Sequence, residues 1–132
     1  MYMLDTNTCI YILKKRALPL LEKFESAGND QICLSVITYA ELNYGVAHSQ
    51  SKKLNQIILS DFVSRLEIMP WNSAAAEEYG RLRVYLEKKG TPIGNMDLLI
   101  AAHALSEKCV LVTNNLREFK RVPHLKYEDW SL

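Results

Sequence analysis

The chain begins with MYMLDTN (residues 1–7), in which a short apolar run ends at the carboxylate of Asp5. A short apolar run followed at once by capping residues is typical of a strand that leads into a helix. We therefore expect a strand over residues 2–4 and a helix capped by Thr6 or Asn7. A carboxylate at the end of a buried strand is unfavourable unless a metal, a set of donors or catalysis uses it.

The same alternation of short apolar runs and amphipathic stretches continues along the chain. We expect further strands at residues 31–34, 67–71, 109–112 and 125–127, and helices over 6–15, 18–26, 35–44, 54–66, 73–89 and 95–105. Short apolar strands that alternate with helices predict an α/β fold, with three α/β/α layers around a short, mainly parallel sheet. In such folds functional sites form at the carboxyl ends of the strands.

Length and composition agree with a folded globular protein. At 132 residues, with 48% hydrophobic and 23% charged residues, the chain fits one domain over residues 1–132 with a single core. No apolar run approaches the ~20 residues that a bilayer span needs, and the first residues lack the pattern of a secretory signal. We expect a soluble, cytoplasmic protein that makes no membrane contact.

The charge balance limits how the protein can bind nucleic acid. A net charge of +1 gives no long-range field for a polyanion, so phosphate contacts must come from local clusters. Arg117, Lys120 and Arg121 form one such cluster and are candidates for binding RNA phosphates.

The cysteines and histidines show no metal-ligand pattern. Cys9, Cys33 and Cys109 are odd in number and far apart, so we expect buried free thiols. The three histidines are scattered, and His103, inside an apolar helical stretch, is expected to be a packed structural residue. A zinc site is not indicated.

Four acids recur at strand ends or on apolar helical stripes: Asp5, Glu41, Asp97 and Glu118. Each alone has an ordinary explanation as a helix cap, a first-turn acid or a solvated charge. Four of them in a small α/β domain predict one site. Glu41 shares one face of its predicted helix with Ile37, Ala40 and Tyr44, and we expect this face to point toward the protein interior.

Converging carboxylates raise one another's pKa unless a cation is bound, which favours a hard metal such as Mg²⁺. A carboxylate-held Mg²⁺ can activate water and stabilise charge on a phosphoryl group, and so points to phosphodiester hydrolysis. Asn7, Ser35 and Thr113 lie at the same strand ends, where their polar groups suit the orientation of waters, carboxylates or a phosphate oxygen. Capping explains Ser35 equally well.

Four segments, in order and with compatible spacing, resemble the PIN-domain ribonucleases, and more narrowly the VapC toxins of bacterial toxin–antitoxin pairs. They are MLDTN (3–7), SVITYAEL (35–42), PIGNMD (92–97) and TNNLREF (113–119), and the resemblance spans residues 3–130. It implies a PIN-like fold and a Mg²⁺- or Mn²⁺-dependent endoribonuclease. The substrate would be structured RNA, in many members a tRNA or rRNA loop, whose cleavage arrests translation.

The resemblance also assigns roles to the acids. Asp5 and Asp97 match the principal metal ligands, Glu41 matches the acid of the second motif, and Glu118 matches the acid before the last Phe. Asn115 stands where many PIN domains carry Asp. The number of metal ions at the site therefore stays open. It also stays open whether Glu118 supplies the negative charge that Asp would provide at position 115.

The partners implied by the resemblance are a small VapB-like antitoxin and a second toxin copy in a homodimer. The antitoxin's C-terminal segment would cover the acidic groove, and its N-terminal part would bind operator DNA. Single-stranded loops are the physical expectation for the RNA. For Tyr39, Tyr44 and Trp71 core packing is expected rather than base stacking.

Three other classes compete with this interpretation. A haloacid-dehalogenase-like phosphatase needs a second acid at position 7, where this chain has Asn7, which argues against that class. A receiver domain needs adjacent acids near its first strand, and this pattern is absent. A metal- or RNA-binding module without catalysis, acting mainly through a partner protein, remains the alternative.

Overall fold

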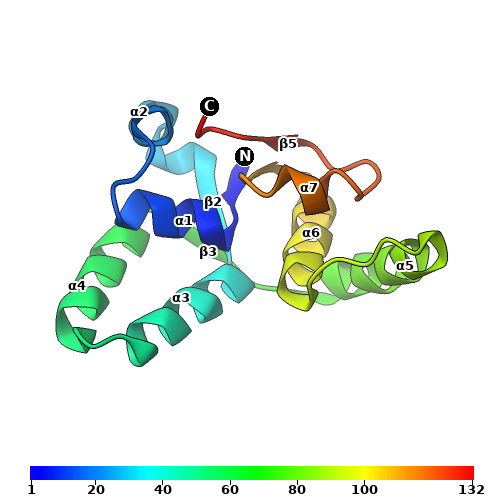
Figure 1. Ribbon diagram of the computed structural model, residues 1–132, viewed down its shortest axis with the longest axis horizontal. Helices are drawn as coiled ribbons and strands as arrows, with labels where there is room; N and C mark the ends of the chain where they lie inside the picture. The colour runs from blue at the N-terminus through cyan, green and yellow to red at the C-terminus, as the bar shows by residue number, and fades with distance from the viewer.

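A five-stranded sheet forms the centre of the computed structural model, which describes residues 1–132 (Figure 1). The strands are β1 (Tyr2–Leu4), β2 (Ile32–Ser35), β3 (Glu67–Met69), β4 (Val110–Val112) and β5 (Tyr127–Glu128). Their order is β3-β2-β1-β4-β5, and every neighbouring pair is parallel. The predicted α/β fold is confirmed, with a sheet that is wholly parallel.

Seven α-helices surround the sheet. They are α1 (Thr6–Leu13), α2 (Leu18–Ala27), α3 (Val36–His48), α4 (Lys52–Val63), α5 (Ser73–Lys89), α6 (Asn95–Glu107) and α7 (Leu116–Phe119), with a 3₁₀ turn over Asn29–Gln31. The sequence did not predict α7, because four residues are too few to show helical periodicity. Gly90, with φ of +69°, ends α5 at the predicted stop, in the left-handed conformation that glycine adopts readily.

Alternate residues of the strands build two separate cores, one on each face of the sheet, so the prediction of a single core was wrong. Met3 and Leu111 pack with residues of α5 and α6, whereas Leu4 and Val112 pack on the opposite face with residues of α1, α2 and α4. This is the two-residue period of a strand buried on both faces. Figure 1 shows α1 to α4 on one side of the sheet and α5 and α6 on the other, which is the predicted three-layer arrangement.

The cysteines and His103 behave as predicted. Cys9, Cys33 and Cys109 are free and buried, and His103 is fully buried. No helix has the length and apolar character that crossing a bilayer requires.

The predicted inward face of α3 was wrong. Tyr44 is 69% exposed and stacks on His48 at 5.6 Å between ring centroids, and Ala40 is also exposed. Thr38 and Leu42 form the buried face instead. The prediction placed the more apolar residues inward. The polar Thr38 is buried instead, because its hydroxyl has a hydrogen-bond partner in Thr6, 32 residues earlier in the chain.

Candidate active site

The carboxyl ends of three adjacent strands bring Asp5, Ser35 and Thr113 to one edge of the sheet. Leu4 of the central strand pairs with Leu34 on one side and Val112 on the other. Asp5, Ser35 and Thr113 directly follow Leu4, Leu34 and Val112, so they lie side by side. The Asp5 amide continues the hydrogen-bond ladder of the sheet by donating to Val112 O at 3.0 Å. The predicted location of the site at the strand ends thus has a geometric basis.

Asp5 caps α1 with its own carboxylate. Its Oδ1 accepts a 2.8 Å hydrogen bond from the Thr8 amide, so the prediction of Thr6 or Asn7 as the cap was wrong. The strand passes into the helix without an intervening residue, which leaves Asp5 in the capping position. Asp5 is only 2% exposed, and this burial raises its pKa, although hydrogen bonds from Thr113 and Thr8 oppose the rise.

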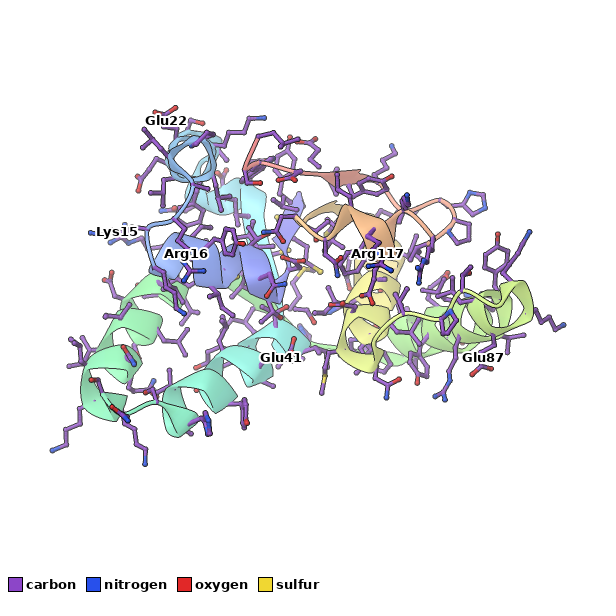
Figure 2. All side chains as sticks on the ribbon, viewed as in Figure 1. Lys15, Arg16, Glu22, Glu41, Glu87 and Arg117 are labelled. Atoms are coloured by element: carbon purple, nitrogen blue, oxygen red, sulfur yellow. The ribbon has the colours of Figure 1, made fainter.

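Glu41 reaches this edge from α3. Its Oε1 accepts a 2.6 Å hydrogen bond from the Thr6 hydroxyl, which also lies 3.4 Å from the Thr38 hydroxyl. Glu41 is half-buried, and its charge contributes to the raised pKa of Asp5. Figure 2 shows Glu41 on α3 and Arg117 on α7, at the two sides of the site.

Asn115 joins the remaining two acids. Its Nδ2 lies 3.4 Å from Oδ2 of Asp97 and 3.2 Å from Oε2 of Glu118. Burial, followed by the adjacent Glu118 carboxylate, raises the pKa of Asp97 to about 7, and the charges of Asp5 and Glu41 contribute. The two carboxyls therefore titrate together: the pKa of Asp97 is raised, and the contact with Asp97 lowers the pKa of Glu118.

Thr113 connects the two halves of the acid cluster. It lowers the pKa of the neighbouring Asp5 carboxyl, and its Oγ1 accepts a 2.9 Å hydrogen bond from the Asn115 backbone amide. Asn115 then contacts Asp97 and Glu118 through its side chain. All four predicted acids are thus brought together, with Thr113 and Asn115 between them.

Ser35 and His103 form a buried pair behind the acids. The Ser35 hydroxyl accepts the Ile37 amide at 3.0 Å, which caps α3, and lies 2.7 Å from Nδ1 of His103. Burial lowers the pKa of His103, so its ring is neutral at physiological pH. The pair ties α3, which carries Glu41, to α6, which carries Asp97. Ser35 makes no hydrogen bond to the acids themselves.

The other predicted polar residues lie at the surface. Asn7 is exposed and its side chain has no hydrogen-bond partner within the chain. Arg117 and Lys120 are exposed on and just after α7, while Arg121 is half-buried and donates to the Pro92 carbonyl at 2.9 Å. The three ion pairs of the molecule all lie elsewhere, on α5 and beside α4. None of the four acids forms an ion pair, although the charge of Arg121 helps to lower the pKa of Glu118.

The donor set fits a hard divalent cation. No three Asp, Glu, His or Cys groups are arranged as a compact metal site, but Mg²⁺ is commonly held by one or two carboxylates and keeps several waters. Asp5 and Asp97 offer oxygen ligands, and their pKa values are raised mainly by burial, with a further contribution from the neighbouring acids. A cation at this place would relieve that repulsion.

Thr6, Thr8 and Thr38 are site residues that the sequence analysis missed. Thr8 holds Asp5, and Thr6 holds Glu41. One signal was available, since Thr38 and Glu41 are three residues apart on one helix and therefore share a face.

Comparisons with known proteins agree on one family. A family model described as the PIN domain matches residues 2–125. The chain is 49% identical over 131 residues to "Ribonuclease VapC2" of Rickettsia felis, covering 98% of each protein. It is 43% identical over 129 residues to "tRNA(fMet)-specific endonuclease VapC" of Salmonella typhimurium, covering 98% of this chain and 97% of the relative.

A solved complex shows the same fold. The structure of VapBC2 from Rickettsia felis bound to a DNA fragment from its promoter contains a chain that superposes with a TM-score of 0.92. That chain is 47% identical, and the match covers 98% of both chains.

Proposed function

The chain belongs to the PIN-domain family, among the VapC ribonucleases, and we propose that it is the toxin of a type II toxin–antitoxin pair. In this role residues 1–132 act as one nuclease domain that hydrolyses phosphodiester bonds in RNA. The observation that carries the proposal is the convergence of Asp5, Glu41, Asp97 and Glu118 at one sheet edge, where none of them forms an ion pair.

PIN-domain nucleases generally depend on a divalent metal. We assign Mg²⁺, with Mn²⁺ as the close substitute, because carboxylate and amide oxygens are the available donors. When bound, the ion lowers the pKa of a water and offsets charge on the phosphate under attack.

The chain's own residues prepare this chemistry. The Thr8 amide holds the Asp5 carboxylate in place, and the first turn of α6 presents Asp97, so these two acids are the proposed metal ligands. Glu41, held by Thr6, is placed to orient the attacking water or to accept its proton. Glu118 adds negative charge beside Asp97, and Asn115 fixes the distance between them.

The substrate we propose is structured RNA, cut in a tRNA or rRNA loop in the cytoplasm, with arrest of translation as the consequence. The Salmonella relative named for tRNA(fMet) cleavage supports the tRNA class. Unstacked loop nucleotides can enter a site between helices, whereas paired ones cannot. Arg117, Lys120 and Arg121 lie next to Glu118, where they can bind the phosphates flanking the cut.

A groove beside the acids suits the antitoxin. It has a volume of 390 Å³, lies between α1, α3 and α4, and is lined by residues that include Ile10, Leu13, Leu42, Ile58 and Glu41. An amphipathic antitoxin helix would bury its apolar side there, and a basic residue following it would reach Glu41. By analogy with the DNA-bound relative, operator DNA is bound through a VapB-like partner. We further propose that the toxin forms a homodimer.

The test is to incubate the purified, partner-free protein with total RNA in Mg²⁺, in Mn²⁺ and in EDTA. We expect defined fragments with either metal and none in EDTA. Cleavage in EDTA would reject the metal assignment. Binding of RNA without cleavage in any metal would favour the non-catalytic module instead.

A further inference from the structure

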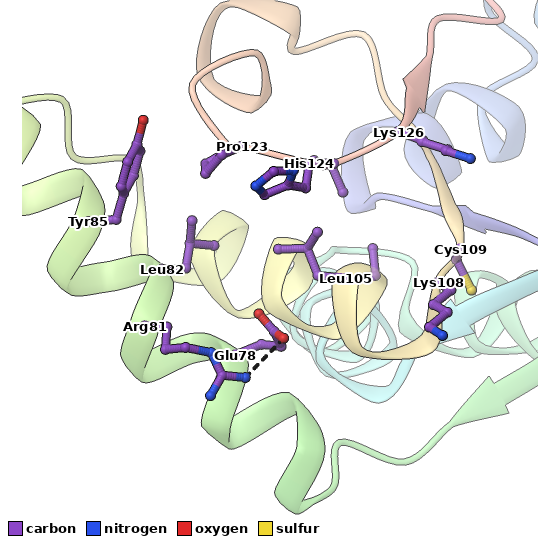
Figure 3. A pocket seen from close by; sticks show the side chains of 12 residues that line it. Glu78, Arg81, Leu82, Tyr85, Leu105, Lys108, Cys109, Pro123, His124 and Lys126 are labelled. Carbon is purple, nitrogen blue, oxygen red and sulfur yellow. Dashed lines mark hydrogen bonds and ion pairs between the residues drawn. The ribbon is translucent and has the colours of Figure 1, made fainter.

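A second cavity lies at the end of α6 remote from Asp97. It has a volume of 670 Å³ and opens between α5, the last turn of α6 and residues 123–126 (Figure 3). None of the four acids, nor any residue hydrogen-bonded to them, lines it. A role in holding the metal is therefore excluded for this cavity.

Its walls combine apolar, aromatic and cationic groups. Leu82, Leu105 and Leu125 supply apolar surface, and the rings of Tyr85 and His124 also line the cavity (Figure 3). Tyr85 is 40% exposed, and Lys89 Nζ lies 5.7 Å from the centroid of its ring, so a ligand that reaches the ring also meets a cationic group. Such walls suit a flat, partly apolar group.

The charges around the cavity select an anion. Arg81, Lys108 and Lys126 line it, and the single acid is Glu78, which is 3.0 Å from Arg81 and so already paired. Lys108 and Lys126 have no ion-pair partner. A ligand with a planar apolar part and a negative charge, such as a nucleotide, matches both properties.

A basic segment runs from the acid cluster to this cavity. Between residues 117 and 126 the chain carries Arg117, Lys120, Arg121, His124 and Lys126 against the single acid Glu118. Along α6, Leu105 at the cavity is eight residues from Asp97, which at 1.5 Å per residue is about 12 Å. At the ~3.4 Å spacing of a stacked strand, about three to four nucleotides cover that distance.

We propose that this cavity binds one unstacked nucleotide of the substrate RNA, about three to four nucleotides from the scissile phosphate. The base contacts Tyr85, His124 and the leucines, and the adjoining phosphates contact Lys108 and Lys126. The inference rests on the proposed RNA substrate. It adds a second point of attachment, so that the sequence or shape of the RNA beyond the cut influences binding.

The experiment measures binding separately from cleavage. A fluorescein-labelled single-stranded RNA of about twelve nucleotides, long enough to span both places, is titrated with the full chain in EDTA. We expect Tyr85→Ala to weaken binding about tenfold and Tyr85→Phe to restore it, since the stacking surface remains. Lys126→Ala weakens binding, and the matched control Lys52→Ala, on the exposed start of α4, leaves it unchanged.

Cross-linking locates the contact. An RNA of the same length that contains 4-thiouridine is irradiated with the protein, and the modified peptides are identified by mass spectrometry. Adducts on residues 82–89 or 123–126 support the proposal. Adducts confined to α3 and α7, or wild-type affinity in Tyr85→Ala and Lys126→Ala, would overturn it.

Two further measurements distinguish RNA from a small-molecule ligand, and the cavity proposal from the proposed catalytic function. If free AMP binds the cavity with no gain from a longer RNA, the ligand is a small molecule and the proposal is wrong. If the protein fails to cut RNA in Mg²⁺ while the binding results hold, the proposed catalytic function fails and the cavity assignment stands.

Discussion

Thr6 donates a 2.6 Å hydrogen bond to Glu41, and this contact joins the first residue of α1 to the middle of α3. Asp5, the residue before Thr6, is held by the Thr8 amide in the same turn. The threonine-rich start of α1 therefore positions two acids that are 36 positions apart in the sequence. The catalytic arrangement depends on this turn as much as on the carboxylates.

Removing the Thr6 hydroxyl tests this dependence. We expect Thr6→Val to lower kcat about ten- to hundredfold, since hydrogen bonds to charged groups contribute about 1.5–3 kcal/mol. Thr6→Ser retains the hydroxyl and serves as the matched control, with activity close to wild type. The measurement is the rate of cleavage of a purified transcript at saturating Mg²⁺, and equal rates for both variants would contradict the role.

The raised pKa of Asp97 predicts a pH dependence of stability. The folded-state pKa of Asp97, about 7, is above its ordinary value of 3.8, so the folded protein binds the proton more tightly than the unfolded chain. The metal-free protein should therefore lose stability as pH rises from about 4 to about 7. Thermal unfolding in EDTA measures this slope, and Asp97→Asn should flatten it.

Metal binding should couple to the same proton. Because a ligand carboxylate must be deprotonated, Mg²⁺ affinity should rise as pH increases through about 7, with proton release on binding. Calorimetric titration in buffers of different ionisation enthalpy measures the released proton. A pH-independent affinity between pH 6 and pH 8 would be incompatible with Asp97 as a ligand.

Substitution of Asn115 tests the role of its amide between Asp97 and Glu118. Asn115→Asp should destabilise the metal-free protein, because the amide donor to Asp97 and Glu118 becomes a third charge. The same change should strengthen Mg²⁺ binding. Asn115→Ala, which removes the donor without adding charge, is the control, and it should weaken activity without strengthening metal binding.

The buried Ser35 and His103 pair should contribute to stability. Ser35→Ala removes the cap of α3 and the 2.7 Å partner of His103, and should cost about 1–3 kcal/mol of the free energy of unfolding. Urea unfolding measures the change. A double-mutant cycle with His103→Leu isolates the pair, and additive effects would show that the two residues do not interact.

The sequence predicted the sheet and the meeting of the acids because both follow from local patterns. Asp5 and Thr113 directly follow apolar strands, and parallel strands place their carboxyl ends at one edge. The expected cap of α1 was Thr6 or Asn7, and capping by Asp5 was only one of the ordinary explanations of that acid. The burial of Thr38 escaped prediction, because its contact joins residues far apart in the chain, which periodicity does not register.

The most direct test of the account is the single-turnover rate of RNA cleavage by Asp5→Asn and Asp97→Asn in Mg²⁺. These substitutions preserve side-chain size and remove the charge that holds a divalent ion. We predict rates at least about a hundredfold below wild type for both variants, with folding confirmed by circular dichroism. Wild-type rates in either folded variant would contradict the assignment of the acid cluster as a metal-dependent nuclease site.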